Sequence, residues 1–164
     1  MSDSEYQRGA FSHLRTIFVT VAILVLTCMA PAHSVEVEDL DLDQYRGKIV
    51  VLDFWASWCV PCRRSFPWMN EMQEKYADDG LVIIAVNVDN DASDADEFLQ
   101  QYPPNFLIVY DKNHELVREY AVEAMPSSFL IGRDGTRIES HLGFKTAKTD
   151  EYEAAIVAAL GKTK

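Results

Sequence analysis

The sequence predicts an α/β domain with a central mixed sheet, helices on both faces and a C-terminal antiparallel hairpin. Apolar runs of strand length alternate with segments whose apolar residues recur at helical spacing, which favours parallel strands covered by helices. Two strand-like runs late in the chain meet at a tight-turn sequence, which predicts the hairpin. The chain has 164 residues, 48% of them hydrophobic and 25% charged, which is enough for one domain with its own core.

The first half of the domain alternates strand, helix, strand and helix. The run "KIVVLDFWA" (48–56) is typical of a strand buried on both faces. Residues 60–78 follow as a helix with one apolar face. The run "LVIIAVNVD" (81–89) predicts a second strand, and Ser93 with Asp96 predicts the capped start of the next helix.

The second half adds a strand, a short helix, the hairpin and a last helix. Residues 105–111 read as a strand, and residues 113–122 as a short helix. The hairpin spans residues 126–144 and turns at Arg133-Asp134-Gly135. A helix over 149–161 closes the chain, which gives the order β-α-β-α-β-α-β-β-α.

An apolar stretch near the N-terminus predicts export from the cytoplasm. Residues 17–30 are apolar apart from two threonines and Cys28, and small residues follow them before an acidic run. This is the layout of a secretory signal, with cleavage expected after Ser34. A retained membrane anchor is the alternative, since a span needs roughly 20 apolar residues. We expect residues 1–34 to be a signal peptide or N-terminal membrane anchor. The domain, residues 35–164, is then periplasmic or otherwise extracytoplasmic, either soluble or tethered to the inner membrane.

Two cysteines lie where the first strand gives way to a helix, in the sequence "WCVPC". A helix N-terminus offers unpaired N–H groups and a positive dipole end, which stabilise a thiolate. Arg63 and Arg64 add positive charge nearby. Cys59 is therefore the expected attacking thiolate and Cys62 the resolving thiol. Pro61 is tolerated early in a helix, because its missing N–H is not needed there.

Composition and ligand count argue against other classes of function. A structural zinc site needs four ligands, and the remaining candidates, His114 and His141, lie far apart in the sequence. A net charge of −11 disfavours nucleic-acid binding, which depends on basic residues. An inert disulfide across so short a loop would add little stability. Copper(I) can bind two thiolates, so a copper-binding or redox-sensing module stays open as an alternative. For a redox enzyme we expect no metal and no other cofactor.

A CxxC pair near a βαβ pattern is typical of thioredoxin-type proteins. The segment "VVLDFWASWCVPCR" resembles the active-site segment of the thioredoxin superfamily, and "AMPSSFLIGRDGTRIESHLGF" is similar to its cis-proline loop and hairpin. With the signal-like N-terminus, the resemblance is to the exported TlpA/ResA/DsbE-like branch. It covers roughly residues 40–160 and implies a thioredoxin fold.

The resemblance implies a role for each matching residue. Met125-Pro126 becomes a cis peptide beside the cysteines, where the backbone of Met125 would pair with a substrate peptide. With Trp58 and Pro61, these residues would form the substrate-binding surface. Asp53 lies in an apolar strand, where its pKa should rise. The resemblance makes Asp53 the proton acceptor for Cys62; a satisfied aspartate with no catalytic role is the alternative.

Two departures from the family pattern are visible. The lysine that thioredoxins carry near the aspartate is replaced by Ala85 in the expected register. ResA-like proteins use a glutamate after the second strand, where this chain offers Asp89 or Asp91.

The resemblance implies a thiol–disulfide oxidoreductase with a redox-active Cys59–Cys62 disulfide. Its direction would be reduction of disulfides in exported proteins, with cytochrome c maturation as the leading pathway. A disulfide oxidase or isomerase is the enzymatic alternative. The partners would be protein thiols and disulfides, together with a membrane-bound or soluble reductant that recharges the dithiol.

Overall fold

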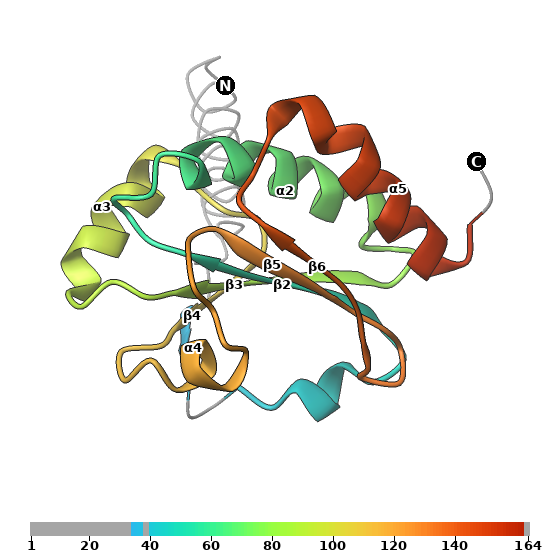
Figure 1. Ribbon diagram of the computed structural model, residues 1–164, viewed down its shortest axis with the longest axis horizontal. Helices are drawn as coiled ribbons and strands as arrows, with labels where there is room; N and C mark the ends of the chain where they lie inside the picture. Colours follow the sequence, from blue (N-terminus) through green and yellow to red (C-terminus); the bar gives the residue numbers. More distant parts are fainter. Residues whose placement is uncertain (1–33, 38–39, 163–164) are drawn as a thin grey trace, which may run out of the picture. The chain divides into compact units, whose positions relative to one another are not determined.

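The central sheet combines parallel and antiparallel pairing. The computed structural model describes residues 34–37 and 40–162, which belong to one unit over residues 32–164 (Figure 1). Six strands follow the order β1-β4-β3-β2-β5-β6. Neighbours among β1, β4, β3 and β2 pair in parallel, whereas β5 pairs antiparallel with both β2 and β6. The strands are β1 (Ser34–Glu36), β2 (Ile49–Trp55), β3 (Leu81–Asn87), β4 (Leu107–Tyr110), β5 (Ser127–Ile131) and β6 (Arg137–Leu142).

Helices cover both faces of this sheet. In Figure 1, α2 and α5 lie over one face and α4 lies against the other. Phe66 of α2 contacts Trp55 of β2 and Phe98 of α3 with ring centroids 4.8 and 4.9 Å apart, so these three aromatic residues join helix and sheet. The α-helices are α2 (Cys62–Tyr76), α3 (Ala92–Gln101), α4 (Glu115–Glu119) and α5 (Thr149–Leu160); the 3₁₀ turns are η2 (Leu42–Tyr45) and η3 (Thr146–Lys148).

The predicted α/β class, mixed sheet and closing hairpin are confirmed. All seven residues of β2 are buried, as the continuous apolar run predicted. The hairpin turn falls at Arg133–Gly135: Gly135 has φ 79°, and the Gly132 N–H donates to the Thr136 carbonyl. The strand β1 was not predicted.

Two predicted helix starts are wrong. The α2 helix begins at Cys62 and not at residue 60, because the chain first makes a turn in which the Cys62 N–H donates to the Cys59 carbonyl. The α3 helix is capped by Asp91 and not by Ser93 with Asp96, because the chain is still extended at Asp91 and its carboxylate accepts the Ser93 N–H. Asp96 instead accepts a hydrogen bond from Tyr110.

The predicted signal peptide or anchor lies outside the described residues, apart from Ser34. Ser34 is the first residue of β1, so the predicted cleavage point falls within this strand. Of the helices formed by residues 34–37 and 40–162, none combines the length and apolar character that a membrane crossing requires.

Candidate active site

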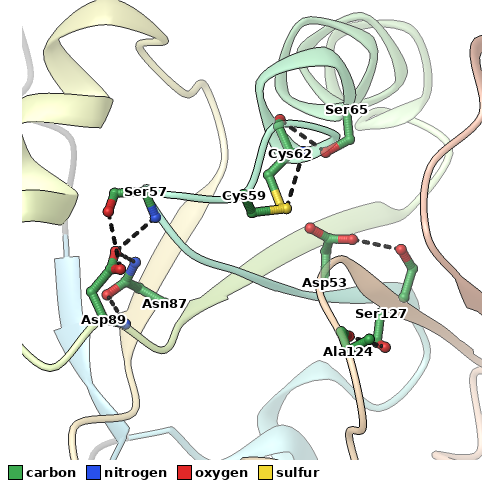
Figure 2. Close-up of a disulfide and its surroundings, with 10 residues drawn as sticks. Asp53, Ser57, Cys59, Cys62, Ser65, Asn87, Asp89, Ala124 and Ser127 are labelled. Atoms are coloured by element: carbon green, nitrogen blue, oxygen red, sulfur yellow. Dashed lines mark hydrogen bonds between the residues drawn. A yellow bond between two sulfur atoms is a disulfide. The ribbon is translucent and has the colours of Figure 1, made fainter.

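Cys59 and Cys62 form a disulfide between the end of β2 and the start of α2 (Figure 2). Their Cα atoms are 5.3 Å apart, and only 3% of Cys59 and none of Cys62 is exposed. The Cys62 N–H, at the first residue of α2, donates to the Cys59 carbonyl and also lies 3.3 Å from the Cys59 sulfur. When the disulfide opens, this amide and the helix dipole stabilise a thiolate on Cys59.

The surface next to the disulfide is apolar and open. Trp58 is 66% exposed and Val60 is 56% exposed, although both are large hydrophobic residues. Trp58 also lines a groove of about 380 Å³ that reaches Phe98 and Tyr102 of the α3 region. Exposed apolar residues beside a reactive group are typical of a surface that a partner covers.

Asp53 is buried in the middle of β2, below the cysteine pair. Only 1% of the residue is exposed, and Figure 2 shows its carboxylate pointing toward the cysteines. The Ser128 hydroxyl donates to Asp53 Oδ1 at 2.5 Å, while Oδ2 has no hydrogen-bond partner within the described part of the chain. Burial raises the pKa of Asp53 to about 7, and the Ser128 hydrogen bond opposes this shift only in part.

The residue opposite Asp53 on β3 is Ala85, as the sequence predicted. No cation is therefore supplied from that position, which leaves burial as the dominant influence on the Asp53 carboxyl. A carboxyl with a pKa near neutrality can both accept and release a proton under physiological conditions.

The Met125–Pro126 peptide bond is cis, as the resemblance implied. It directly precedes β5, whose first residue Ser127 pairs with Phe54 of β2. The proline loop is held from two sides: the Ser127 hydroxyl donates to the Ala124 carbonyl at 2.7 Å, and the Gly143 N–H donates to the Pro126 carbonyl at 2.8 Å.

Asp89 and Asp91, the two candidates for the family's loop glutamate, have different surroundings. Asp89 is buried and accepts hydrogen bonds from the Ser57 backbone N–H at 2.9 Å, from the Ser57 hydroxyl at 3.0 Å and from the Asn87 amide at 2.8 Å (Figure 2). Asp91 is exposed and caps α3. Asp89 is thus the one bonded to the loop that carries the cysteines.

Sequence analysis missed the partners of these carboxylates. The sequence placed Ser128 only within the predicted hairpin, and nothing in it singled out Ser57. Alternation within β5 places Ser128 on the same face as Leu130, but only the antiparallel register with β2 brings it to Asp53. That long-range register is not visible in the sequence.

One known protein family covers the part of the chain that contains these residues. The model of the Redoxin family matches residues 27–156. The chain belongs to the Redoxin family. The match spans the disulfide, Asp53 and the cis-proline loop, and it stops within α5.

Relatives of this Redoxin-family protein carry names for one chemistry. The thiol-disulfide oxidoreductase ResA of Bacillus thuringiensis subsp. konkukian is 37% identical over 120 residues, which are 73% of this chain and 69% of ResA. A Chlorobium tepidum crystal structure that carries the name thiol:disulfide interchange protein DsbE is 48% identical, with a TM-score of 0.73 over 74% of this chain and 86% of that one.

A third relative is the exposed lipoprotein thioredoxin Etrx1 of Streptococcus pneumoniae. It is 26% identical, with a TM-score of 0.63 over 71% of this chain and 89% of that one. Together with the disulfide in the CxxC segment, these findings show that this Redoxin-family protein has a thioredoxin fold and is a thiol–disulfide oxidoreductase acting on protein thiols.

Proposed function

We propose that this protein reduces disulfides in exported proteins, with Cys59 attacking, Cys62 resolving and Asp53 accepting the Cys62 proton. One observation carries the proposal. The buried Asp53 carboxyl lies beside the cysteine pair, and the Cys59 sulfur lies against the Cys62 N–H at the start of α2. Cys59 attacks a substrate disulfide and forms a mixed disulfide, and one substrate sulfur leaves as a thiolate. The Cys62 thiol then gives its proton to Asp53, attacks Cys59 and releases the second substrate thiolate.

The electrostatics of the site favour reduction over oxidation. An oxidase needs a strongly stabilised thiolate, which makes its dithiol form the more stable one. Here the Cys59 sulfur accepts one backbone N–H, from Cys62, and the carboxyl of Asp53 lies below the pair. When ionised, Asp53 disfavours thiolates and so favours the disulfide. A pair that prefers the disulfide gives up its electrons readily, which is the property of a reductase.

The substrate surface includes Trp58, Pro61, Met125 and Pro126. A peptide lying across the cysteines would contact the exposed Trp58 ring and pair with the Met125 backbone. Exported apocytochromes c are the leading substrate class, through the resemblance to the TlpA/ResA/DsbE-like branch. A location outside the cytoplasm is supported by the signal-like N-terminus and by the likeness to an exposed lipoprotein thioredoxin. A separate membrane-bound or soluble reductant recharges the dithiol.

The direction of electron flow is tested by the reduction potential of the full-length protein. We expect a value below about −225 mV in glutathione or dithiothreitol buffers, nearer to the roughly −270 mV of thioredoxin than to the roughly −180 mV of protein disulfide isomerase. A value well above the isomerase's would contradict the reductase assignment. Tight binding of one copper(I) without insulin reduction would favour a binding module instead.

The cysteine roles are tested by two serine variants. Cys59→Ser should abolish insulin reduction, because no attacking thiolate remains. Cys62→Ser should accumulate mixed disulfides with substrate, because Cys59 still attacks and nothing resolves the intermediate. Non-reducing gel electrophoresis detects these adducts, and a Cys62→Ser protein that traps none would reverse the assignment.

A further inference from the structure

Three polar residues form a row across neighbouring strands, from the buried Asp53 to the surface. Asp53 of β2 pairs in register with Ser128 of β5, and Ser128 pairs in register with His141 of β6. Residues directly opposite each other on paired strands lie on the same face of a sheet. Asp53, Ser128 and His141 therefore share one face, the one that lines a cavity with α2 and α5.

The cavity is lined mainly by apolar side chains, but all three polar residues of the row reach it. Its volume is about 30 Å³, and Asp53, Ser128 and His141 all line it, together with Ser65 of α2 and Tyr152 of α5. A single water molecule needs about 10–15 Å³ of such volume and at least two polar partners. The cavity therefore has room for one or two water molecules between the Asp53 carboxyl and the His141 ring.

The His141 end of the row reaches solvent. The His141 side chain is 28% exposed, whereas Asp53 is 1% exposed. A proton accepted by Asp53 consequently has no direct exit to water. Ser128 donates to Asp53 Oδ1 at 2.5 Å, and a hydroxyl can accept a second hydrogen bond while it donates.

We propose that His141 transfers the proton between Asp53 and solvent, through Ser128 and water in this cavity. The proposal rests on the proposed role of Asp53 as the acceptor of the Cys62 proton. As the disulfide forms, the Cys62 proton passes to the Asp53 carboxylate and the sulfur attacks Cys59. The Asp53 carboxyl then releases this proton to a cavity water. His141 takes one up on one ring nitrogen and loses one to solvent from the other, so the enzyme ends the step with no net gain of protons.

Two further groups contact the His141 ring. Glu139 of the same strand places Oε1 3.5 Å from His141 Nε2. Tyr152 of α5 packs against the ring with centroids 4.8 Å apart and lines the same cavity. The titratable groups that contact His141 or share its cavity are thus Glu139, Tyr152 and Asp53.

The relay is tested with the full-length His141→Phe and His141→Gln variants. The reaction followed is the resolution of a preformed mixed disulfide between Cys59 and a small thiol. We expect both variants to resolve it about tenfold more slowly than wild type, because neither side chain can take up and release a proton near neutral pH. Added free imidazole should accelerate resolution of the mixed disulfide more in the His141 variants than in the wild type. Far-ultraviolet circular dichroism confirms that both are folded.

Two matched variants and Asp53→Asn separate the possible outcomes. Ser140 lies on the same strand as His141 but faces the other side of the sheet, so Ser140→Ala should keep the wild-type rate. His114 is a histidine outside the row, with Nε2 3.2 Å from the Val88 carbonyl, and His114→Gln should also keep the wild-type rate. If Asp53→Asn is slow and both His141 variants are as fast as wild type, the relay is wrong and the role of Asp53 stands. If Asp53→Asn is also fast, the role of Asp53 itself fails. A wild-type rate in His141→Gln alone, or slow variants that imidazole does not accelerate, would show a structural role and overturn the relay.

Discussion

The Asp53 side chain carries a stability cost that its chemistry explains. A buried carboxylate without a cationic partner destabilises the folded protein. Asp53 reduces this destabilisation because its carboxyl stays protonated to higher pH. Its pKa of about 7 keeps both protonation states accessible near neutrality. A leucine in this strand would avoid this cost, but it could not serve in the proposed proton transfer from Cys62. Within the described residues Oδ2 has no hydrogen-bond partner, which leaves that oxygen open to a proton.

Asp53→Asn should stabilise the oxidised protein at high pH. The native pKa is about 7, and an unfolded aspartate has a pKa near 3.9. Unfolding then releases a proton between about pH 4 and 7, so the Asp53 contribution to stability falls as the pH rises through this window. Urea unfolding of Asp53→Asn should give a free energy up to about 4 kcal/mol above wild type at pH 8, and close to wild type at pH 4. The exposed Asp78→Asn serves as the control, and equal pH profiles for Asp53→Asn and wild type would contradict the assigned burial effect.

At the scale of the elements, local patterns predicted more than long-range pairing did. The β2 and β3 runs predicted their strands, because continuous burial requires a continuous apolar sequence. The predicted start of α2 was wrong, because helix propensity does not reveal that residues 59–61 form a separate turn before the helix. The Asp91 cap was missed because the helix begins two residues earlier than predicted, where a different carboxylate accepts the Ser93 N–H. Contacts between strands, such as Asp53 with Ser128, depend on a register that no local pattern encodes.

The loop between β2 and α2 is held in place from the end of β3. Asp89 accepts two hydrogen bonds from Ser57, which lies two residues before Cys59, and a third from Asn87. The buried carboxylate therefore fixes the backbone that leads into the disulfide. This arrangement couples the position of Cys59 to the neighbouring strand without any contact to the sulfur atoms.

Asp89→Asn should slow catalysis without unfolding the protein. Asparagine keeps one acceptor oxygen but replaces the other with an N–H₂ donor, so either the Ser57 N–H loses its acceptor or the Ser57 hydroxyl must turn to accept a hydrogen bond. A small displacement of a reacting group lowers rates steeply, and we expect insulin reduction to fall roughly tenfold. The matched control is Asp91→Asn, which retains a capping side chain on α3 and should keep wild-type activity. Equal activity of the two variants would show that Asp89 does not position the loop.

At the scale of the whole molecule, net charge and the exposed apolar surface are expected to affect different steps of substrate binding. The net charge of −11 creates a negative field around the protein. The surface beside the disulfide is apolar at Trp58 and Val60, and the adjoining groove is lined by Asp94, Glu97 and Arg63. We expect the long-range field to influence which proteins approach, and the apolar residues to contact the peptide that reaches Cys59.

Reduction of positively charged protein disulfides should therefore depend on salt. Attraction between opposite net charges speeds encounter at low ionic strength and is screened as the Debye length shrinks from about 30 Å at 0.01 M to below 10 Å at physiological salt. We expect the second-order rate constant for a basic protein substrate to fall about threefold or more between roughly 0.01 and 0.5 M salt, and that for an acidic substrate to rise. A small uncharged disulfide serves as the control and should show little change. Stopped-flow tryptophan fluorescence can follow all three reactions. Equal salt dependence for basic and acidic substrates would mean that contacts at Trp58 and Val60, and not the overall charge, determine which proteins this oxidoreductase meets.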